Sequence, residues 1–542
     1  MLTYNGKEYD TLKGETYYDA VKRHGLKGVL AVQLGGRPMG LNEHASRNAA
    51  ALTLAQEEGR RIYERSLRFV MLMAFSRLFP GAHLRFDNSF GHGILVSTRG
   101  IVLSDENVAA LETEMRSITD AALPFTMELL SKDEAIEYYS ANNMPDKAAV
   151  LKYRAQEYIR MFECGGYKEY FYGEMTHDTS DVSAFGLTKV GDNVVLRLPD
   201  YRQPDEASPF KPMPKLLEVF NESNEWLKIL KVENVAELNA LTESGKLREF
   251  IRINEALMDM RINKIAESII QKGSRLVLIA GPSSSGKTTF CNRLDIALRV
   301  HGLTPVKLSL DNYYLDRDKA PLDEFGKPDL ECVEALDTAL INEQLAKILA
   351  GEKVAMPVFD FETQKRSSET ITVQVPSDAP IIIEGIHGLN EQLTSLIPAK
   401  DKFKIYISAL TNINVDDHNR IRTTDARLIR RIVRDSMFRG TEVQATLEMW
   451  DSVRRGEEKY IFPFQEEADA MINSSLVYEL AIVKKYVYKQ LMSVTEDKPY
   501  YSIARRLVKF LNYVKSAEVD DEVPLNSLLR EFIGGSCFYR EE

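Results

Sequence analysis

The stretch Gly281-Pro-Ser-Ser-Ser-Gly-Lys-Thr288 constrains the fold of this chain more than any other part of its sequence. It has the spacing GxxxxGK[ST] and follows an apolar run, residues 275–280, that is typical of a strand buried on both faces of a parallel sheet. Glycines allow the backbone to fold around phosphate oxygens, and the N-terminus of a following helix adds positive potential. The motif therefore predicts an α/β domain that binds a nucleoside triphosphate.

The residues of this loop have different expected roles. Lys287 is predicted to contact the outer phosphates, and the hydroxyl of Thr288 is predicted to hold Mg²⁺. ATP and Mg²⁺ are accordingly the expected cofactors. The residues predicted to bind ATP are Gly281, Pro282, Ser283, Ser284, Ser285, Gly286, Lys287, Thr288 and Thr289.

Strand-like and helix-like segments alternate after the loop. Strands are expected near residues 305–310, 380–384 and 402–407, with helical segments between them. This alternation predicts a doubly wound parallel sheet in a domain that spans about residues 273–490.

Triphosphate binding alone leaves GTPases, ATPase motors and small-molecule kinases open. A GTPase should carry the guanine-reading pattern Asn-Lys-x-Asp after the loop. The only Asn-Lys pair in the sequence, Asn263-Lys264, precedes the loop, which argues against a GTPase. A kinase needs a carboxylate beside the γ-phosphate to take a proton from the acceptor hydroxyl. Asp311 and Glu384 each end an expected strand, at the edge of the sheet where ligands bind. We expect Asp311 to be the catalytic base, and Thr288, Asp311 and Glu384 to form the metal site.

Positive charge is concentrated further along, although the chain has 69 Lys+Arg against 80 Asp+Glu and a net charge of −11. Between residues 420 and 439, seven arginines accompany two aspartates. Such a run is usually a solvated helix face, but here a mobile lid that closes over phosphates is favoured. The seven are Arg420, Arg422, Arg427, Arg430, Arg431, Arg434 and Arg439.

Several segments between residues 281 and 435 resemble the uridine kinase and phosphoribulokinase group of P-loop kinases. The resemblance implies transfer of the γ-phosphate of ATP to the 5′-hydroxyl of a ribonucleoside, as in uridine and cytidine kinases. It also implies that Asp311, Lys287 and Arg434 act in catalysis. The segments are 281–288, 309–314, 328–329, 359–366, 384–387 and 427–435. The substrate contacts that it implies are Tyr314, Asp329, Phe359, Phe361, Gln364, Arg366 and Arg431.

Two of these positions depart from the family pattern. Phe359 replaces a tyrosine, and Gln364 replaces a histidine that meets the pyrimidine edge. Because a glutamine side chain both donates and accepts, it is able to read a base edge, but the accepted base stays open. A kinase of another small alcohol, such as a sugar phosphate or pantothenate, and an ATP-controlled regulator that binds RNA or tRNA stay open as well.

The front of the chain resembles a different group of proteins. On residues 29–36, 60–63, 78–80 and 173–189, residues 1–58 resemble the TGS module, a ubiquitin-like β-grasp fold, and residues 59–215 resemble the α+β editing domain of threonyl-tRNA synthetases. That editing site uses an HxxxH and a CxxxH pair, and none of the corresponding residues here is such a metal ligand. We therefore expect no hydrolytic editing but a binding or regulatory role, with weak RNA binding as one form of it. The four residues are Arg65, Phe69, Phe171 and Met175.

The remaining parts are predicted from their composition. Residues 216–272 are expected to form a helical connector and residues 491–542 a helical tail, with an apolar helix pattern over 523–536 that ends at Gly534-Gly535. That pattern fits a docking helix or a cover over a neighbouring subunit's site. Four scattered cysteines, and the lack of a leader-like or membrane-spanning apolar run, predict a cytoplasmic protein that does not enter a membrane. A small-molecule nucleoside is the expected partner, and a homo-oligomer is expected.

Overall fold

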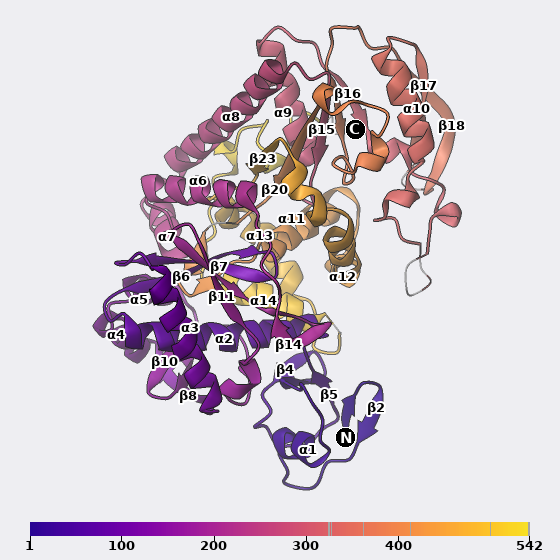
Figure 1. Cartoon of the computed structure of the whole chain (residues 1–542). Helices are drawn as coiled ribbons and strands as arrows, with labels where there is room; N and C mark the ends of the chain where they lie inside the picture. Colours follow the sequence, from indigo (N-terminus) through magenta and orange to yellow (C-terminus); the bar gives the residue numbers. More distant parts are fainter. Residues whose placement is uncertain (323–325, 327, 361–362, 412, 499, 540–542) are drawn as a thin grey trace.

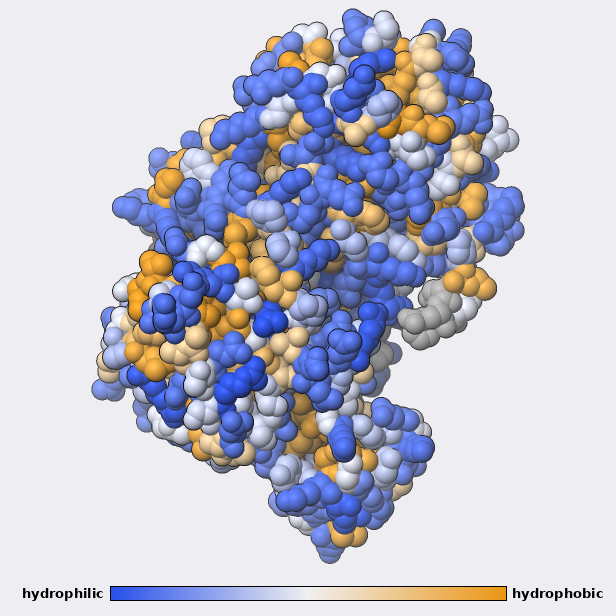
Figure 2. All heavy atoms as spheres, in the orientation of Figure 1, coloured by the Kyte–Doolittle hydropathy of each residue, from blue (hydrophilic) through white to orange (hydrophobic). Residues whose placement is uncertain are grey.

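The computed structural model describes residues 1–322, 326, 328–360, 363–411, 413–498 and 500–539. Figure 1 shows a small N-terminal module at the bottom, a second domain above it and a large sheet domain at the top. The face of the molecule in Figure 2 is mostly hydrophilic, with scattered apolar areas. Among the described residues, no helix combines the length and apolar character that a membrane span requires.

The sheet domain is built on five parallel strands in the order β16-β19-β15-β20-β23. The predicted α/β fold with a parallel sheet is confirmed, and the unpredicted β23 adds a strand at one edge. Val277 and Ile279 of β15 face one apolar core while Leu276 and Leu278 face another, because helices pack on both sides of the sheet. The strands are β15 (Leu276–Ala280), β16 (Val306–Ser309), β19 (Ile381–Glu384), β20 (Lys402–Ser408) and β23 (Ala470–Asn473).

Helices and one hairpin complete this domain. The hairpin of β17 (Val354–Asp360) and β18 (Lys365–Val373) extends at its outer edge, as Figure 1 shows. The helices are α9 (Lys287–Val300), α10 (Thr338–Leu349), α11 (Thr423–Phe438), α12 (Val443–Tyr460) and α13 (Glu479–Met492).

The N-terminal module is a five-stranded sheet, in the order β2-β1-β5-β3-β4, with one helix. Asn5 and Gly6 both have positive φ, at 48° and 75°, and make the tight turn of the first hairpin. Its elements are β1 (Leu2–Tyr4), β2 (Lys7–Tyr9), α1 (Tyr17–Arg23), β3 (Ala31–Leu34), β4 (Arg37–Met39) and β5 (Ala49–Leu52). The resemblance of this module to a TGS domain stays a prediction.

The second domain surrounds the long helix α2 (Glu57–Leu78), which is buried along most of its length. A four-stranded antiparallel sheet, β11-β12-β7-β6, and a three-stranded sheet, β10-β9-β8, form its β structure. Its other elements are β6 (His83–Phe90), β7 (Gly93–Arg99), α3 (Asp105–Asp120), β8 (Thr126–Ser131), α4 (Lys132–Ala141), α5 (Pro145–Leu151), β9 (Tyr158–Cys164), β10 (Tyr167–Tyr170), β11 (Gly186–Val190), β12 (Asn193–Arg197), β13 (Pro199–Asp200) and β14 (Gln203–Ala207).

The connector consists of α6 (Pro214–Leu230), α7 (Val235–Glu243) and α8 (Leu247–Lys272), and Gly273 ends α8 with φ 68°. The tail contains α14 (Tyr501–Leu511) and the four-residue α15 (Arg530–Ile533). The predicted helix over 523–536 is therefore wrong in extent. Its apolar spacing reflects the burial of Leu528, Leu529 and Phe532 in a core that the tail shares with the connector and the sheet domain.

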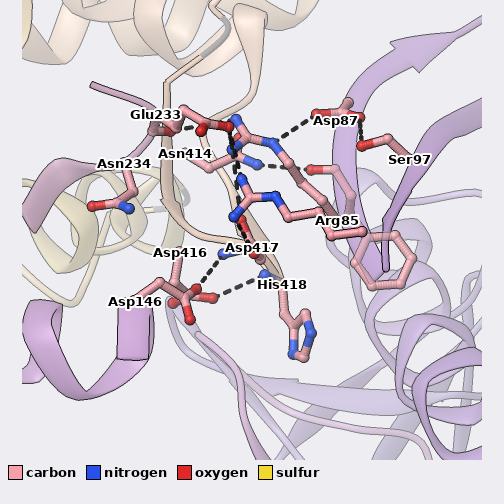
Figure 3. A network of polar contacts seen from close by, with 12 residues as sticks. Arg85, Asp87, Ser97, Asp146, Glu233, Asn234, Asn414, Asp416, Asp417 and His418 are labelled. Carbon is pink, nitrogen blue, oxygen red and sulfur yellow. Dashed lines mark hydrogen bonds and ion pairs between the residues drawn. The ribbon is translucent and has the colours of Figure 1, made fainter. Parts of the chain in front are cut away.

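A short hairpin, β21 (Asn414–Asp416) and β22 (Asn419–Arg420), fastens the sheet domain to the second domain. Arg85 of β6 pairs with Asp87 at 2.8 Å and lies 3.5 Å from Asp417 of the hairpin (Figure 3). Lys147 donates to Asp416 at 2.9 Å, and both side chains are buried. Because breaking a buried pair leaves an uncompensated charge, these contacts hold the two domains in a defined arrangement.

Candidate active site at the phosphate loop

The loop between β15 and α9 has the backbone geometry that its glycines allow. A side chain on Gly281 would place its Cβ 2.0 Å from the carbonyl oxygen of Ile407, so that only glycine fits beside β20. Gly286 has φ 86° and is the N-cap of α9, which begins at Lys287. The predicted strand, loop and helix therefore follow one another as expected, and the first turn of α9, whose N–H groups have no partner within the helix, begins where the loop ends.

Lys287 lies inside the loop. Its ammonium group donates to the carbonyl oxygens of Gly281 at 2.9 Å and Pro282 at 3.2 Å. Burial lowers the pKa of Lys287, while the carboxylates of Glu384 and Asp311 act in the opposite direction. The ammonium is thus a desolvated positive charge at the place where phosphates are expected.

The three residues predicted to bind metal lie together beside this lysine. Thr288 donates to the carboxylate of Glu384 at 3.5 Å. Burial and the neighbouring Asp311 raise the pKa of Glu384 to about 7. Burial also raises the pKa of Asp311, against the effect of Lys287 and Arg439. Two partly desolvated carboxyl groups and a hydroxyl are hard oxygen ligands, so this set fits Mg²⁺.

Two arginines of α11 reach the loop. The Nε of Arg427 donates to the carbonyl oxygen of Ser283 at 2.9 Å, and Arg431 donates to the Ser283 hydroxyl at 3.0 Å. Glu457 of α12 pairs with Arg427 and accepts from the Ser283 N–H at 3.1 Å. Glu457 was not predicted, since nothing in its local sequence marks a residue that contacts the loop from 174 positions away.

The prediction that all seven arginines form a lid is wrong. Arg430 is completely buried and pairs with Glu479, and its guanidinium also donates to the Ser474 carbonyl at 2.9 Å. Arg420 and Arg422 pair with Glu64 of the second domain. These three arginines therefore form ion pairs with carboxylates that are distant in sequence. The pairs fix the position of α11 and of the residues just before it.

Of the remaining four, Arg427 pairs with Glu457, and a single aspartate binds the other three. Asp435 lies 3.2 Å from Arg431, 3.0 Å from Arg434 and 3.6 Å from Arg439. Arg434 is thus placed on Asp435, and its catalytic role stays a prediction. Asp435 keeps a cluster of three positive charges together beside the loop.

Apart from Arg431 on α11, the described residues among the predicted substrate contacts lie on the β17–β18 hairpin and on the loop after β16. The rings of Tyr314 and Phe359 are 5.7 Å apart, and Asp329 accepts from the Tyr460 hydroxyl at 3.3 Å. Gln364 has φ 55° and accepts a hydrogen bond from Arg317. The predicted contact Phe361 lies outside the described residues.

Arg366 is held by the protein itself. Its guanidinium donates to the carbonyl oxygens of Tyr313 and Tyr314, both at 3.0 Å, and to Asp337 at 3.1 Å. These contacts fix the backbone beside Asp311. The contacts of Arg366 are therefore explained by a role in positioning this backbone. Its predicted contact with the substrate stays a prediction.

Comparisons with known proteins match the part of the chain that holds this site. The Phosphoribulokinase / Uridine kinase family matches residues 276–480. Uridine kinase from Bacillus pumilus is 32% identical over 196 residues, which are 36% of this chain and 83% of that protein. The chain belongs to the phosphoribulokinase and uridine kinase family. Uridine kinase from Borrelia duttonii is 32% identical over 226 residues, 40% of this chain and 96% of that protein.

One solved structure, a "Possible Uridine Kinase from Bacillus stearothermophilus", covers 40% of this chain and 99% of its own, at 21% identity and a TM-score of 0.28. Membership of the family supports an ATP-dependent kinase, and such kinases usually use Mg²⁺. The matched residues lie in the sheet domain, here called the kinase domain. The resemblance of residues 1–215 to synthetase modules therefore stays a prediction.

The kinase domain contains one further acidic residue that sequence reasoning missed. Burial and the neighbouring Glu457 raise the pKa of Glu331 to about 7. A Cβ on Gly456 of α12 would come within 2.5 Å of the Glu331 Cβ, so a glycine is needed for α12 to pass this side chain. The sequence feature that could have identified Glu331 is its position two residues after Asp329, in a segment that resembles the kinase family.

Proposed function

We propose that this protein transfers the γ-phosphate of ATP to the 5′-hydroxyl of a ribonucleoside, in the manner of uridine and cytidine kinases, giving a nucleoside monophosphate and ADP. The observation that carries the proposal is the convergence of Lys287, Asp311 and Glu384 at the phosphate loop. It occurs in a domain related to uridine kinases. That relationship favours a nucleoside over other alcohols.

Phosphoryl transfer depends on positioning and on neutralising charge more than on covalent chemistry by the protein. Lys287 and Arg431 supply positive charge on two sides of the loop. Thr288, Asp311 and Glu384 would hold Mg²⁺, which supplies charge stabilisation to the phosphates when bound. The raised pKa of Asp311 makes its carboxylate a stronger base toward the acceptor hydroxyl.

The acceptor would lie between the loop after β16 and the β17–β18 hairpin. Asp329 has a carboxylate suited to ribose hydroxyls, and the Tyr314 and Phe359 rings offer aromatic surface to a base. The amide of Gln364 is one side chain able to read the base edge. This arrangement supports a nucleoside and leaves the identity of the base to experiment.

The test is a panel with the full chain, ATP and Mg²⁺. Each common ribonucleoside is offered in one arm, and a sugar phosphate and pantothenate are offered in others. Mass spectrometry then identifies the product. A nucleoside monophosphate formed with equimolar ADP supports the proposal. Phosphorylation of a non-nucleoside alcohol alone would replace it by the small-alcohol kinase.

A separate arm adds tRNA without any small alcohol. ATP hydrolysis that rises with tRNA, together with no phosphorylated nucleoside, would favour the RNA-binding regulator. The N-terminal half is the part to which that activity would be assigned. No such stimulation is expected if the kinase proposal is right.

A further inference from the structure

Residues 527–539, here called the C-terminal segment, lie on the phosphate loop of the same chain. A Cβ on Gly286 would be 3.5 Å from the Leu528 side chain. The carboxylate of Glu531 accepts the backbone N–H of Thr289 at 3.2 Å and the Thr289 hydroxyl at 2.8 Å. The tail thus docks, as predicted, and it does so on the phosphate loop and the first turn of α9.

Thr289 lies in the first turn of α9, where a bound phosphate group is expected. Thr289 is the third residue of α9, whose N-cap is Gly286, and first-turn N–H groups have no partner within the helix. In a phosphate loop these groups, with the positive end of the helix, are donors for phosphate oxygens. A carboxylate is an anion with similar acceptor oxygens, so Glu531 occupies donors that a phosphate group would use.

The first part of the segment is firmly anchored. Ser527 donates to Glu255 of the connector at 2.5 Å, and Leu528, Leu529 and Phe532 are fully buried. The backbone that carries Glu531 is therefore part of the shared core. Release of the Thr289 donors requires only that the Glu531 side chain turn away, without unfolding of the segment.

The second part follows two glycines and is more exposed. Gly534 and Gly535 have φ of 87° and 70°, and Cys537 and Tyr539 beyond them are exposed. Burial of the hydroxyl and the nearby carboxylate of Glu531 raise the pKa of Tyr539. The Tyr539 hydroxyl also hydrogen-bonds the Thr289 and Thr288 side chains, so it lies against the same first turn of α9 as Glu531.

We propose that Glu531 competes with nucleotide: its carboxylate occupies the Thr289 donors while the site is free and turns away when ATP binds, and residues 536–539 move with it about the glycine pair. The inference rests on the proposed function, because it assumes that ATP binds at this loop. It adds a regulatory element within the same chain. Anything that holds the Glu531 side chain away from Thr289 would raise nucleotide affinity.

The first measurement is the affinity for ADP with Mg²⁺, by calorimetry on the full chain. Glu531→Gln and Glu531→Ala remove a negative charge that opposes phosphate, so each should bind ADP about tenfold more tightly than the wild type. Glu518→Gln is the matched control, since Glu518 belongs to the same tail but pairs with Lys485 and is 79% exposed. That control should leave the affinity unchanged.

The second measurement uses the wild type and does not depend on any variant folding. The Cys537 amide donates to the Leu525 carbonyl at 3.0 Å, so its hydrogen exchange reports the position of the last residues. ADP with Mg²⁺ should speed exchange at residues 536–539 while residues 527–533 stay protected. Unchanged exchange with ADP bound, or a Glu531 variant that binds ADP equally or more weakly, would overturn the inference.

These outcomes separate the two proposals. If the wild type binds ADP and phosphorylates a nucleoside but neither predicted change occurs, the inference alone fails. If neither the wild type nor a Glu531 variant binds nucleotide, the proposed function fails and the inference falls with it.

Discussion

The phosphate site and the apolar core around Phe69 in the second domain bury side chains of opposite kinds. Lys287 and Glu384 meet at the phosphate site. Burial lowers the pKa of Lys287 and raises the pKa of Glu384, so it favours the neutral form of each. In the second domain, Phe69, Phe171 and Met175 are at most 4% exposed and belong to one apolar core. They are three of the four positions that the predicted resemblance to synthetase editing domains aligns with metal ligands.

The residue at the fourth position, Arg65, also has a structural role. It is buried and donates to the Glu174 carbonyl oxygen. His177, close to these residues in sequence, stacks on Tyr18 with ring centroids 3.6 Å apart and contacts Asn42 at 2.7 Å. Buried charge alone does not distinguish the two regions, because Arg65 is buried too; what indicates function at the loop is that Lys287, Asp311 and Glu384 meet beside the first turn of α9, whereas the packed aromatic rings indicate stability.

The largest expected effect is at the phosphate site. Asp311→Asn should lower kcat by about two to four orders of magnitude, because a lost general base costs that much, while ADP binding persists. Steady-state kinetics and calorimetry measure the two quantities. Asp318→Asn, an exposed residue on the same loop, is the control and should retain activity. Full activity in Asp311→Asn would remove the base from the mechanism.

The reverse behaviour is expected in the second domain. Phe69→Ala should lower the free energy of unfolding by about 3–5 kcal/mol, because the cavity forms in a packed core, while kcat per folded molecule stays the same. Denaturant unfolding and active-site titration measure these. Leu129→Ala, at a residue 60% exposed, should change neither. A selective loss of kcat in Phe69→Ala would show that this core acts on catalysis.

A pH effect of about tenfold is expected at the metal site. With a pKa of about 7, the Glu384 carboxyl is mostly protonated at pH 6 and mostly ionised at pH 8. Mg²⁺ must displace that proton, so its apparent affinity should rise about tenfold from pH 6 to pH 8. Activity titrated with Mg²⁺ at each pH measures this. Glu384→Gln should lose the dependence, and an unchanged dependence in that variant would assign the titration elsewhere.

The smallest expected effect concerns base choice. Gln364→His restores the residue that the family pattern has at this position, and should change the ratio of kcat/KM for uridine to that for adenosine about fivefold, the scale of one hydrogen bond. Competition between the two nucleosides measures the ratio directly. Gln374→His, at an exposed position beyond the hairpin, should leave the ratio unchanged. Equal ratios in wild type and Gln364→His would remove Gln364 from base recognition.

Local sequence predicted the parts of the fold that depend on local chemistry. The alternation of apolar runs and helical spacing was sufficient for β15, β16, β19 and β20, and the loop glycines for the turn into α9. The equally short β23 was missed because Ala470-Met-Ile-Asn473 shows neither the alternation of β16 nor the β-branched run of β19. The arginine run was misinterpreted because its partners, such as Glu64 and Glu479, come from other elements.

The same limit applies to the site. Asp311 and Glu384 were found because the ends of neighbouring parallel strands meet at one edge. Glu457 and Glu531 were not, since each reaches the loop by tertiary packing across a long stretch of chain. Residues placed by topology were predictable, and residues placed by packing were not.

The most direct test of the account is transfer of labelled phosphate from γ-labelled ATP to uridine and to each other common ribonucleoside, by the full chain with Mg²⁺, analysed by mass spectrometry. The account predicts a labelled nucleoside 5′-monophosphate from the wild type with at least one of them, and almost none from Asp311→Asn. If uridine and every other ribonucleoside stay unlabelled while the wild type consumes ATP, the proposed nucleoside kinase is contradicted.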